Sequence, residues 1–249
     1  MIIDTPRDTS QLKTLWKQAF GDPDEFIDCF FRVAYSPQRC RCVFKGDTLA
    51  AMLYWFDCGW GSKRLAYLYA VATEKSMEGQ GLCRALMEDT HRHLKALGYD
   101  GCILVPRTEA LFAMYEKLGY TTCSYVQNFT CEAGAPLPLR QISAEEFAAL
   151  RRQYLPQNGV VQEGSALALL QTYSAFYTGE KVLLAMYVDD GKCTVCELLG
   201  NPDAAPGIIA TLGHRSAKVR TPGCQTPFAM YRSLAEDPAA PSYFGIALD

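Results

Sequence analysis

Two glycines, Gly79 and Gly81, stand immediately before a stretch whose apolar residues recur with a helical period. Glycine lets the backbone approach a ligand closely, because it has no Cβ and tolerates left-handed conformations. The first turn of a helix adds unpaired N–H groups and a partial positive charge, and both favour an anion. A phosphate group is therefore the natural ligand of this arrangement. The same pattern also occurs in ordinary turns, so the two glycines alone leave both interpretations open.

The elements on either side of these glycines are predicted to be a strand and a helix. Leu65–Thr73 lies between two turn-like segments and is rich in residues that favour strands. From Gly81 the apolar period changes from two to about 3.6, which indicates a helix, and Gly98 is placed to end it. Four leucines mark the apolar face of this helix: Leu82, Leu86, Leu94 and Leu97.

The rest of the first half supplies the elements that must hold this loop. Ser10 is predicted to cap a first helix that ends before Gly21, and a second helix follows at 24–35. Further strands are predicted at 41–44, 48–56, 102–105 and 120–131, and a further helix at 110–118. The change from a period of two to 3.6 and back predicts a mixed α/β fold.

The segment 132–138 contains glycine and two prolines and is predicted to be a linker. Beyond it we expect helices at 143–155, 165–177, 205–213 and 228–234, and strands at 182–188, 193–199, 217–221 and 243–248. This order resembles that of the first half. The letters of Phe112–Tyr115 also return at Phe228–Tyr231, which favours an internal duplication.

Three segments of the first half, in order and spacing, resemble the GNAT (GCN5-related N-acetyltransferase) superfamily over residues 1–131. Tyr67–Thr73 is similar to the family's fourth strand, and Leu111–Tyr120 to the stretch that follows its fifth strand. The family's loop motif reads Arg/Gln-x-x-Gly-x-Gly/Ala, and its positions fall here on Glu78, Gly81 and Cys83. Glu78 and Cys83 depart from the motif, whereas Gly81 matches it. The resemblance implies the acyl-CoA N-acyltransferase fold.

The resemblance also implies a cofactor site and a catalytic residue. The phenol of Tyr115 would protonate the departing coenzyme A thiolate, although a tyrosine on an amphipathic helix can also be an ordinary core residue. A backbone N–H near Val71, in a splayed strand, would stabilise the negative charge on the thioester oxygen. The residues expected to bind acetyl-CoA are Val71, Ala72, Thr73, Glu78, Gly79, Gln80, Gly81, Leu82, Cys83 and Arg84.

A general base is harder to assign, because the strand Tyr67–Thr73 contains no acidic residue. Asp57, at the end of the preceding strand, is one candidate, and the alternative is a solvated turn residue. The terminal carboxylate of Asp249 is another, because tandem members of the superfamily can bring the chain end into the active site. Both candidates stay open on the sequence.

The sequence predicts two tandem GNAT-like halves, with the acyl-CoA site in residues 1–132 and a degenerate half in residues 137–249. In the second half the segment Gly200–Gly207 lacks the Gly-x-Gly pattern, and Pro206 removes a backbone donor. We therefore expect one cofactor per chain and a structural role for Tyr231 as the counterpart of Tyr115. Arg220–Gly223 is either a turn after a strand or part of a pocket for an acidic substrate.

Composition narrows the possible functions. Lys and Arg number 24 against 27 Asp and Glu, for a net charge of −3, which argues against a nucleic-acid partner. The N-terminus lacks a signal-like pattern and the apolar runs are short, so we expect no membrane association and a cytoplasmic protein. The eleven cysteines lack metal-site spacing and are expected to be small buried residues, with no metal.

These observations together predict an acetyl-CoA-dependent N-acetyltransferase that acts on a primary amine of a small molecule or peptide. The alternative is a non-catalytic acyl-CoA-binding module with a sensing or assembly role.

Overall fold

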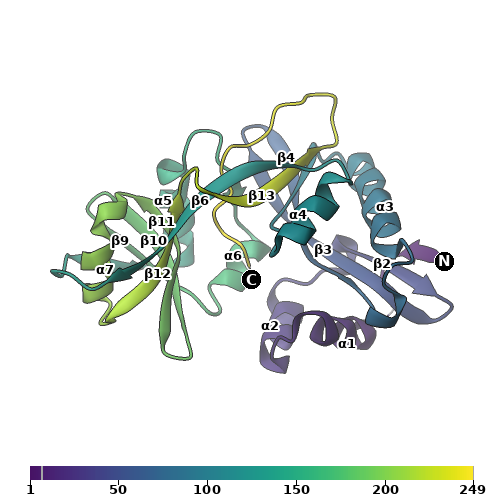
Figure 1. The fold of residues 1–249 in the computed structure, drawn as a ribbon, viewed down its shortest axis with the longest axis horizontal. Coiled ribbons are helices and arrows are strands. Elements are labelled where there is room, and N and C mark those ends of the chain that lie inside the picture. The colour runs from purple at the N-terminus through teal and green to yellow at the C-terminus, as the bar shows by residue number, and fades with distance from the viewer. Residues whose placement is uncertain (7, 249) are drawn as a thin grey trace. The chain divides into compact units, whose positions relative to one another are not determined.

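The computed structural model describes residues 1–6 and 8–248, and these form two compact units (Figure 1). Unit 1 comprises residues 1–121, 164–169 and 230–240, and unit 2 comprises the rest of the described chain. Each unit thus combines stretches that are far apart in the sequence. The predicted halves, 1–132 and 137–249, divide the chain in a different way, because they are continuous.

Unit 1 contains a mixed sheet. Its strands, in order across the sheet, are β1 (Ile2–Asp4), β2 (Cys40–Lys45), β3 (Thr48–Trp60), β4 (Lys63–Thr73), β5 (Gly101–Leu104) and β13 (Thr226–Ser233). All neighbours are antiparallel except β4 and β5, which are parallel. The last strand comes from the far end of the chain, and its pairs run from Met230–Leu104 to Ser233–Gly101.

Helices cover both faces of this sheet (Figure 1). One face is covered by α1 (Thr9–Phe20) and α2 (Asp24–Val33), and the other by α3 (Leu82–Ala96) and α4 (Glu109–Glu116). Successive side chains of β3 point to opposite faces of the sheet, so this strand contributes to the core on each face. Leu53 and Trp55 join the cluster formed by α3 and α4, whereas Tyr54 and Phe56 pack in an aromatic group with α1 and α2.

The predicted helices and strands of the first half are present, with two local corrections. Asp8 caps α1, because its side chain accepts from the backbone N–H of Ser10, which itself lies inside the first turn. Leu97 is wrong as a member of the apolar face. It follows the last helical residue of α3 and is 48% exposed, because the chain turns there toward Gly98.

The strands of unit 2 follow the same succession of directions. In order, they are β7 (Leu139–Ile142), β9 (Ala175–Gly179), β10 (Val182–Asp189), β11 (Lys192–Gly200), β12 (Ser216–Pro222) and β6 (Thr121–Glu132). Only β11 and β12 are parallel. The core on one face forms around α7 (Ala205–Thr211), and α5 (Ala144–Tyr154) packs on the other. The remaining short elements are β8 (Val161–Gln162), in unit 2, and α6 (Ser165–Leu170), which belongs to unit 1 up to Leu169.

Three predictions for the second half are wrong. The segment 228–234 is not a helix but lies in β13, since pairing with β5 decides between two structures that a short apolar run permits equally. The helix predicted at 165–177 ends at Leu170, and its last residues begin β9. The segment 243–248 is buried but forms no ladder; only Tyr243 makes an isolated bridge, to Gly159.

These corrections remove the argument from repeated letters. Phe112–Tyr115 lies in helix α4, whereas Phe228–Tyr231 lies in strand β13. The two segments therefore hold different conformations, and Tyr231 is not the structural counterpart of Tyr115. Tyr231 pairs with Ile103 of β5, and its ring packs over Gly101, where a Cβ would lie 2.4 Å from a ring carbon.

A buried ion pair joins α5 to the sheet of unit 2. Arg151 donates from Nε and Nη2 to the two oxygens of Glu197, at 2.7 and 2.9 Å, and both side chains are almost fully buried. Tyr243 donates its hydroxyl to the same carboxylate at 3.0 Å. Gln162 donates to the carbonyl of Ile246 at 2.7 Å. Side-chain hydrogen bonds thus hold the segment that was expected to be a strand.

Candidate functional site

The loop before α3 leaves a helix start open to a ligand. Gly79 and Gly81 have φ of 74° and 76°, in the left-handed region, and a Cβ on either would meet no atom within 4 Å. Gly81 is the N-cap of α3 and gives no side-chain cap. The first intrahelical bond runs from the N–H of Ala85 to the carbonyl of Gly81, at 3.0 Å. The N–H groups of the preceding turn therefore remain available to an anion.

Charged side chains surround this loop. Lys45, at the end of β2, donates from Nζ to the side-chain oxygen of Gln80. Arg84 is exposed and lies 3.9 Å from Glu88. Glu78, the carboxylate that departs from the family motif, is exposed, so water screens its charge. Lys45 was missed by the sequence analysis, because nothing in the sequence shows which strand end meets this loop.

The end of β4 is distorted beside this loop. Tyr69 pairs with Tyr54 and Ala72 with Met52, so Ala70 and Val71 together oppose one residue of β3. This β-bulge places Ala70 at φ 48°, an uncommon conformation for a residue with a side chain. Such strain, of order 1–3 kcal/mol, tends to occur at functional sites.

The same part of β4 also separates from its parallel neighbour. Among the described residues, the last pair of β4 with β5 is Tyr67 with Ile103, although β4 continues to Thr73. The edge of β4 beyond Tyr67 thus lies open on the side of β5. Val71 belongs to the part of β4 beyond Tyr67, where no pair with β5 is formed among the described residues.

The structure brings the predicted cofactor residues to one end of the unit 1 sheet, where α3 packs on β4. Val71 and Thr73 are half-buried and Ala72 is buried at the end of β4. In the loop and the first turn, Leu82 is buried and Cys83 half-buried, and the exposed members are Glu78, Gly79, Gln80, Gly81 and Arg84.

Tyr115 lies on α4 within the core that α3 and α4 share, and it is 6% exposed. Its ring centroid is 5.7 Å from that of Tyr120. Burial, together with the nearby Cys83 thiol, raises the pKa of Tyr115 above its usual range. Its hydroxyl receives no hydrogen bond from the described residues and donates none to them. The phenol is therefore protonated at neutral pH and is a weaker acid than a solvated tyrosine.

Asp57 belongs to a hydrogen-bonded network and not to this site. Its carboxylate accepts from Arg39, from Arg64 at 3.3 Å and from the hydroxyl of Tyr99. Partial burial raises its pKa, but the bond from Tyr99 and the two guanidinium charges outweigh this and lower it. It pairs with Ala66, whereas the bulge lies further along β4. A carboxylate held in this way is a weak base, and the other candidate, Asp249, lies outside the described residues.

The start of α7 in unit 2 differs from that of α3. The segment after β6 covers it: the N–H of Gly134 donates to the carbonyl of Pro206 at 2.9 Å. A Cβ on Gly207 would meet the carbonyl oxygen of Ala135 at 2.9 Å and the side chain of Leu137 at 2.7 Å. With Pro206 in the first turn, this helix start offers neither the donors nor the space for a phosphate.

Two further observations concern metals and membranes. In residues 1–6 and 8–248, no cluster of three or more His, Cys, Asp or Glu side chains is arranged to hold a metal ion. Among the helices of the same residues, none has the length and apolar character needed to cross a membrane.

Comparison with known proteins concerns the domain and its fold. Residues 4–123 match the family model of the acetyltransferase (GNAT) domain. No curated protein matches the chain. Among solved structures, a GCN5-related N-acetyltransferase from Kribbella flavida superposes with a TM-score of 0.69 at 18% identity, over 94% of this chain and 72% of the other.

Two further structures extend this likeness. Eis1 from Mycobacterium abscessus gives a TM-score of 0.67 at 12% identity, covering 94% of this chain and 73% of its own. An acetyltransferase described as putative, from Pyrococcus horikoshii, gives 0.62 at 13% identity, covering 98% and 91%. At these identities the likeness shows the fold, which extends beyond the segment that the family model matches.

Proposed function

From the premise that residues 4–123 form a GNAT acetyltransferase domain, we propose that this protein transfers an acetyl group from acetyl-CoA to a primary amine of a small molecule or peptide. The observation that carries the proposal is the open start of α3 beside the bulged end of β4. This arrangement places free backbone donors, a helix dipole and an unpaired strand edge together.

The residues of this site fit the parts of the cofactor. The pyrophosphate would accept from the backbone N–H groups of Gly79–Arg84, and Lys45 adds a positive charge. The amide-rich arm would pair with the open edge of β4 at Val71, Ala72 and Thr73, as an added strand would. Glu78 is the unfavourable member, and its exposed position lets it point toward water.

Acetyl-CoA supplies a thioester whose carbonyl carbon is attacked by the amine, so that a C–N bond forms and the C–S bond breaks. The chain stabilises the charge on the carbonyl oxygen through a backbone N–H at the bulge near Val71. Tyr115 then gives its proton to the sulfur of the leaving group, and the nitrogen loses a proton to solvent, from which the phenol is protonated again. Burial raises the pKa of this phenol and makes it a weaker acid, so it would donate only to a thiolate held close to its hydroxyl.

We further propose that the two halves of the chain, 1–132 and 137–249, arose by duplication, and that the second half is degenerate. The strands of the two units support this, because both sets run through five strands in the same succession of directions. The sixth strand is exchanged: β13 of the second half pairs with β5, and β6 of the first half pairs with β12. The covered start of α7 supports one cofactor per chain.

The eleven cysteines are all free thiols. This supports a reducing compartment, and we place the protein in the cytoplasm.

Release of coenzyme A thiol from acetyl-CoA, measured with a panel of amines, tests the proposed activity. Tyr115→Phe should lower kcat by about 10- to 100-fold, the usual contribution of a general acid at its lower end. The dissociation constant of acetyl-CoA should change less than about twofold, because the hydroxyl is used only when the thiolate leaves.

Tyr125→Phe, at an exposed position of β6, is the matched control and should keep the full rate. An unchanged kcat in Tyr115→Phe would remove the acid role. Tight binding of acetyl-CoA without transfer to any amine would disprove the proposed acetyltransferase activity.

A further inference from the structure

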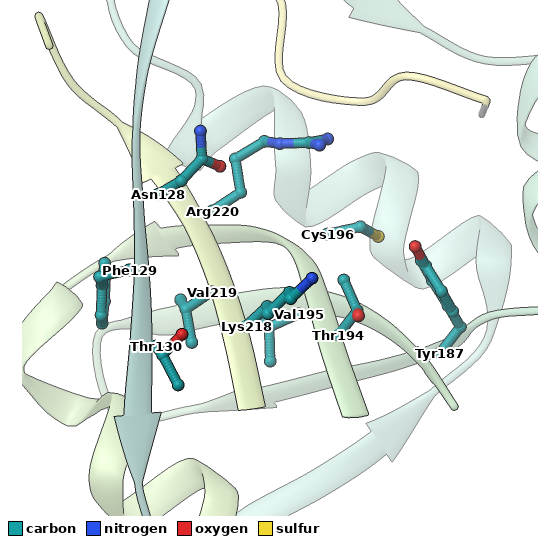
Figure 2. A pocket seen from close by; sticks show the side chains of 10 residues that line it. All are labelled: Asn128, Phe129, Thr130, Tyr187, Thr194, Val195, Cys196, Lys218, Val219 and Arg220. Carbon is teal, nitrogen blue, oxygen red and sulfur yellow. The ribbon is translucent and has the colours of Figure 1, made fainter. Parts of the chain in front are cut away.

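A pocket of about 600 Å³ lies on the face of the unit 2 sheet opposite the core around α7 (Figure 2). It spans β6, β10, β11 and β12. Six of its lining residues carry polar groups beyond the backbone and matter for recognition: Asn128, Thr130, Tyr187, Thr194, Lys218 and Arg220. The pocket lies wholly in unit 2 and is distinct from the acyl-CoA site proposed for unit 1.

The alternation of β12 explains why cations gather here. Ala217 and Val219 point into the core around α7, so Lys218 and Arg220 point to the opposite face. The neighbouring strand β6 follows the same rule. Its Phe129 packs against the α7 core, and Asn128 lies on the pocket side with Arg220, as Figure 2 shows.

Neither cation has an acidic partner among the described residues. Lys218 is exposed and forms no ion pair. Arg220 is half-buried, and its guanidinium carbon lies 4.5 Å from the ring centroid of Phe228. Its Nε is buried and has no hydrogen-bond partner in the described chain. The described residues that line the pocket include no carboxylate, so none of them compensates the two positive charges.

The nearest buried acid of this unit is already neutralised. Glu197 receives two hydrogen bonds from Arg151 and one from Tyr243. Its charge is thus committed to Arg151, and Arg220 gains no ion pair from it. A buried guanidinium nitrogen without an acceptor is costly, and an incoming oxyanion would remove that cost.

We propose that this pocket binds a small molecule through a carboxylate or phosphate group. Arg220, oriented by the ring of Phe228, offers a planar set of donors that matches the oxygens of either group. Lys218 supplies a second charge, and Asn128 and Thr194 supply neutral donors on neighbouring strands. The volume exceeds that of a bare ion and accommodates the body of the molecule as well.

Calorimetric titration tests this with three probes: citrate for carboxylates, glucose 6-phosphate for phosphates and spermidine as a cation. We expect citrate or glucose 6-phosphate to bind one site per chain, and spermidine to bind no more than the buffer blank. Binding of one anion alone assigns the ligand to that class. Arg220→Gln should weaken the binding anion about 10-fold or more, and Lys218→Gln about 3- to 10-fold.

The matched control is Lys181→Gln, which removes one exposed positive charge of unit 2 outside the pocket. It should leave the dissociation constant within about twofold, since exposed charges are screened. Circular dichroism verifies that each variant is folded. The proposal fails if neither anion binds at ~10 mM, well above ordinary ligand affinities, or if Lys181→Gln weakens binding as much as Arg220→Gln does.

Discussion

Units 1 and 2 have the same strand arrangement but differ in the helix start that follows it. Each has one parallel strand pair, β4 with β5 and β11 with β12, and a register shift against the antiparallel neighbour on the other side. In unit 1 the helix that follows begins at an open glycine, Gly81. In unit 2 the corresponding helix begins under the chain segment that contains Gly134.

This difference shows that the buried core determines the strand order, whereas a few loop residues determine whether a helix start can bind an anion. The strand order and the bulges depend on many buried side chains, and a single change does not undo them. The donors at a helix start depend on the conformation of two or three residues and on empty space above them. The parallel strands differ as well. All four residues of β5 are buried, whereas β12 alternates and turns cations to one face.

The largest effect is expected on the free energy of unfolding, from the buried ion pair of unit 2. The core under α1 and α2 in unit 1 is formed instead by aromatic side chains. Glu197→Gln should destabilise the protein by about 3–5 kcal/mol, because the buried guanidinium of Arg151 would lose its counter-charge. Chemical denaturation measures this. Arg152→Gln, which breaks an exposed pair with Glu163 of 2.6 Å, is the control and should cost about 0–1 kcal/mol. Equal losses in both variants would contradict a special role for the buried pair.

Gly81→Asp tests directly whether the open start of α3 binds the cofactor. Aspartate tolerates the left-handed conformation, caps α3 with its own carboxylate and places a negative charge where the pyrophosphate is expected. The dissociation constant of acetyl-CoA should rise about 100-fold, or about 2.7 kcal/mol. Gly191→Asp, at a turn of unit 2 with φ 72° and open space, should leave it unchanged. A similar response in both would place the cofactor elsewhere.

Acid sensitivity should be traced to unit 1. Burial, with the charge of Arg232, lowers the pKa of His91 to about 3, below the ~6.5 of an unfolded chain. Below pH 6.5 the unfolded state takes up a proton that the folded state does not, so stability falls as the pH falls. The loss contributed by this residue should be about 2 kcal/mol at pH 5, at ~1.4 kcal/mol per pH unit.

Denaturation between pH 5 and pH 8, in steps of about one pH unit, measures this slope for the wild type and for His91→Gln. Glutamine can still bond to Tyr120, whose hydroxyl lies 2.7 Å from Nε2 of the histidine. The variant should show a flatter slope than the wild type. Identical slopes in the two proteins would exclude His91 as the cause.

The smallest effect concerns Glu78, which departs from the GNAT loop motif. Glu78→Gln removes an exposed carboxylate beside the proposed phosphate site and should tighten acetyl-CoA binding about two- to threefold, less so at high salt. Glu25→Gln, an exposed position on α2, controls for the change in net charge. Weaker binding in Glu78→Gln would show that the carboxylate takes part in holding the cofactor.

The sequence predicted most of the helices and strands that position the site, because Leu65–Thr73 and the helix from Leu82 follow clear periods and end at glycines. It could not predict β13. The short apolar run Phe228–Tyr231 fits either a helix or a buried strand, and only the distant partner β5 decides between them. Lys45 and Lys218 were missed for a related reason, since their neighbours come from other strands and leave no local pattern.

The strand exchange also bears on how the chain is made. The inner edge of β5 stays unpaired during synthesis until Met230–Ser233 have left the ribosome, long after the rest of the unit 1 sheet has been translated. An uncovered strand edge is a template for pairing with another chain. A fragment cut at the apparent linker, 1–132, would keep that edge permanently and should aggregate, so the two halves of the gene depend on each other for solubility.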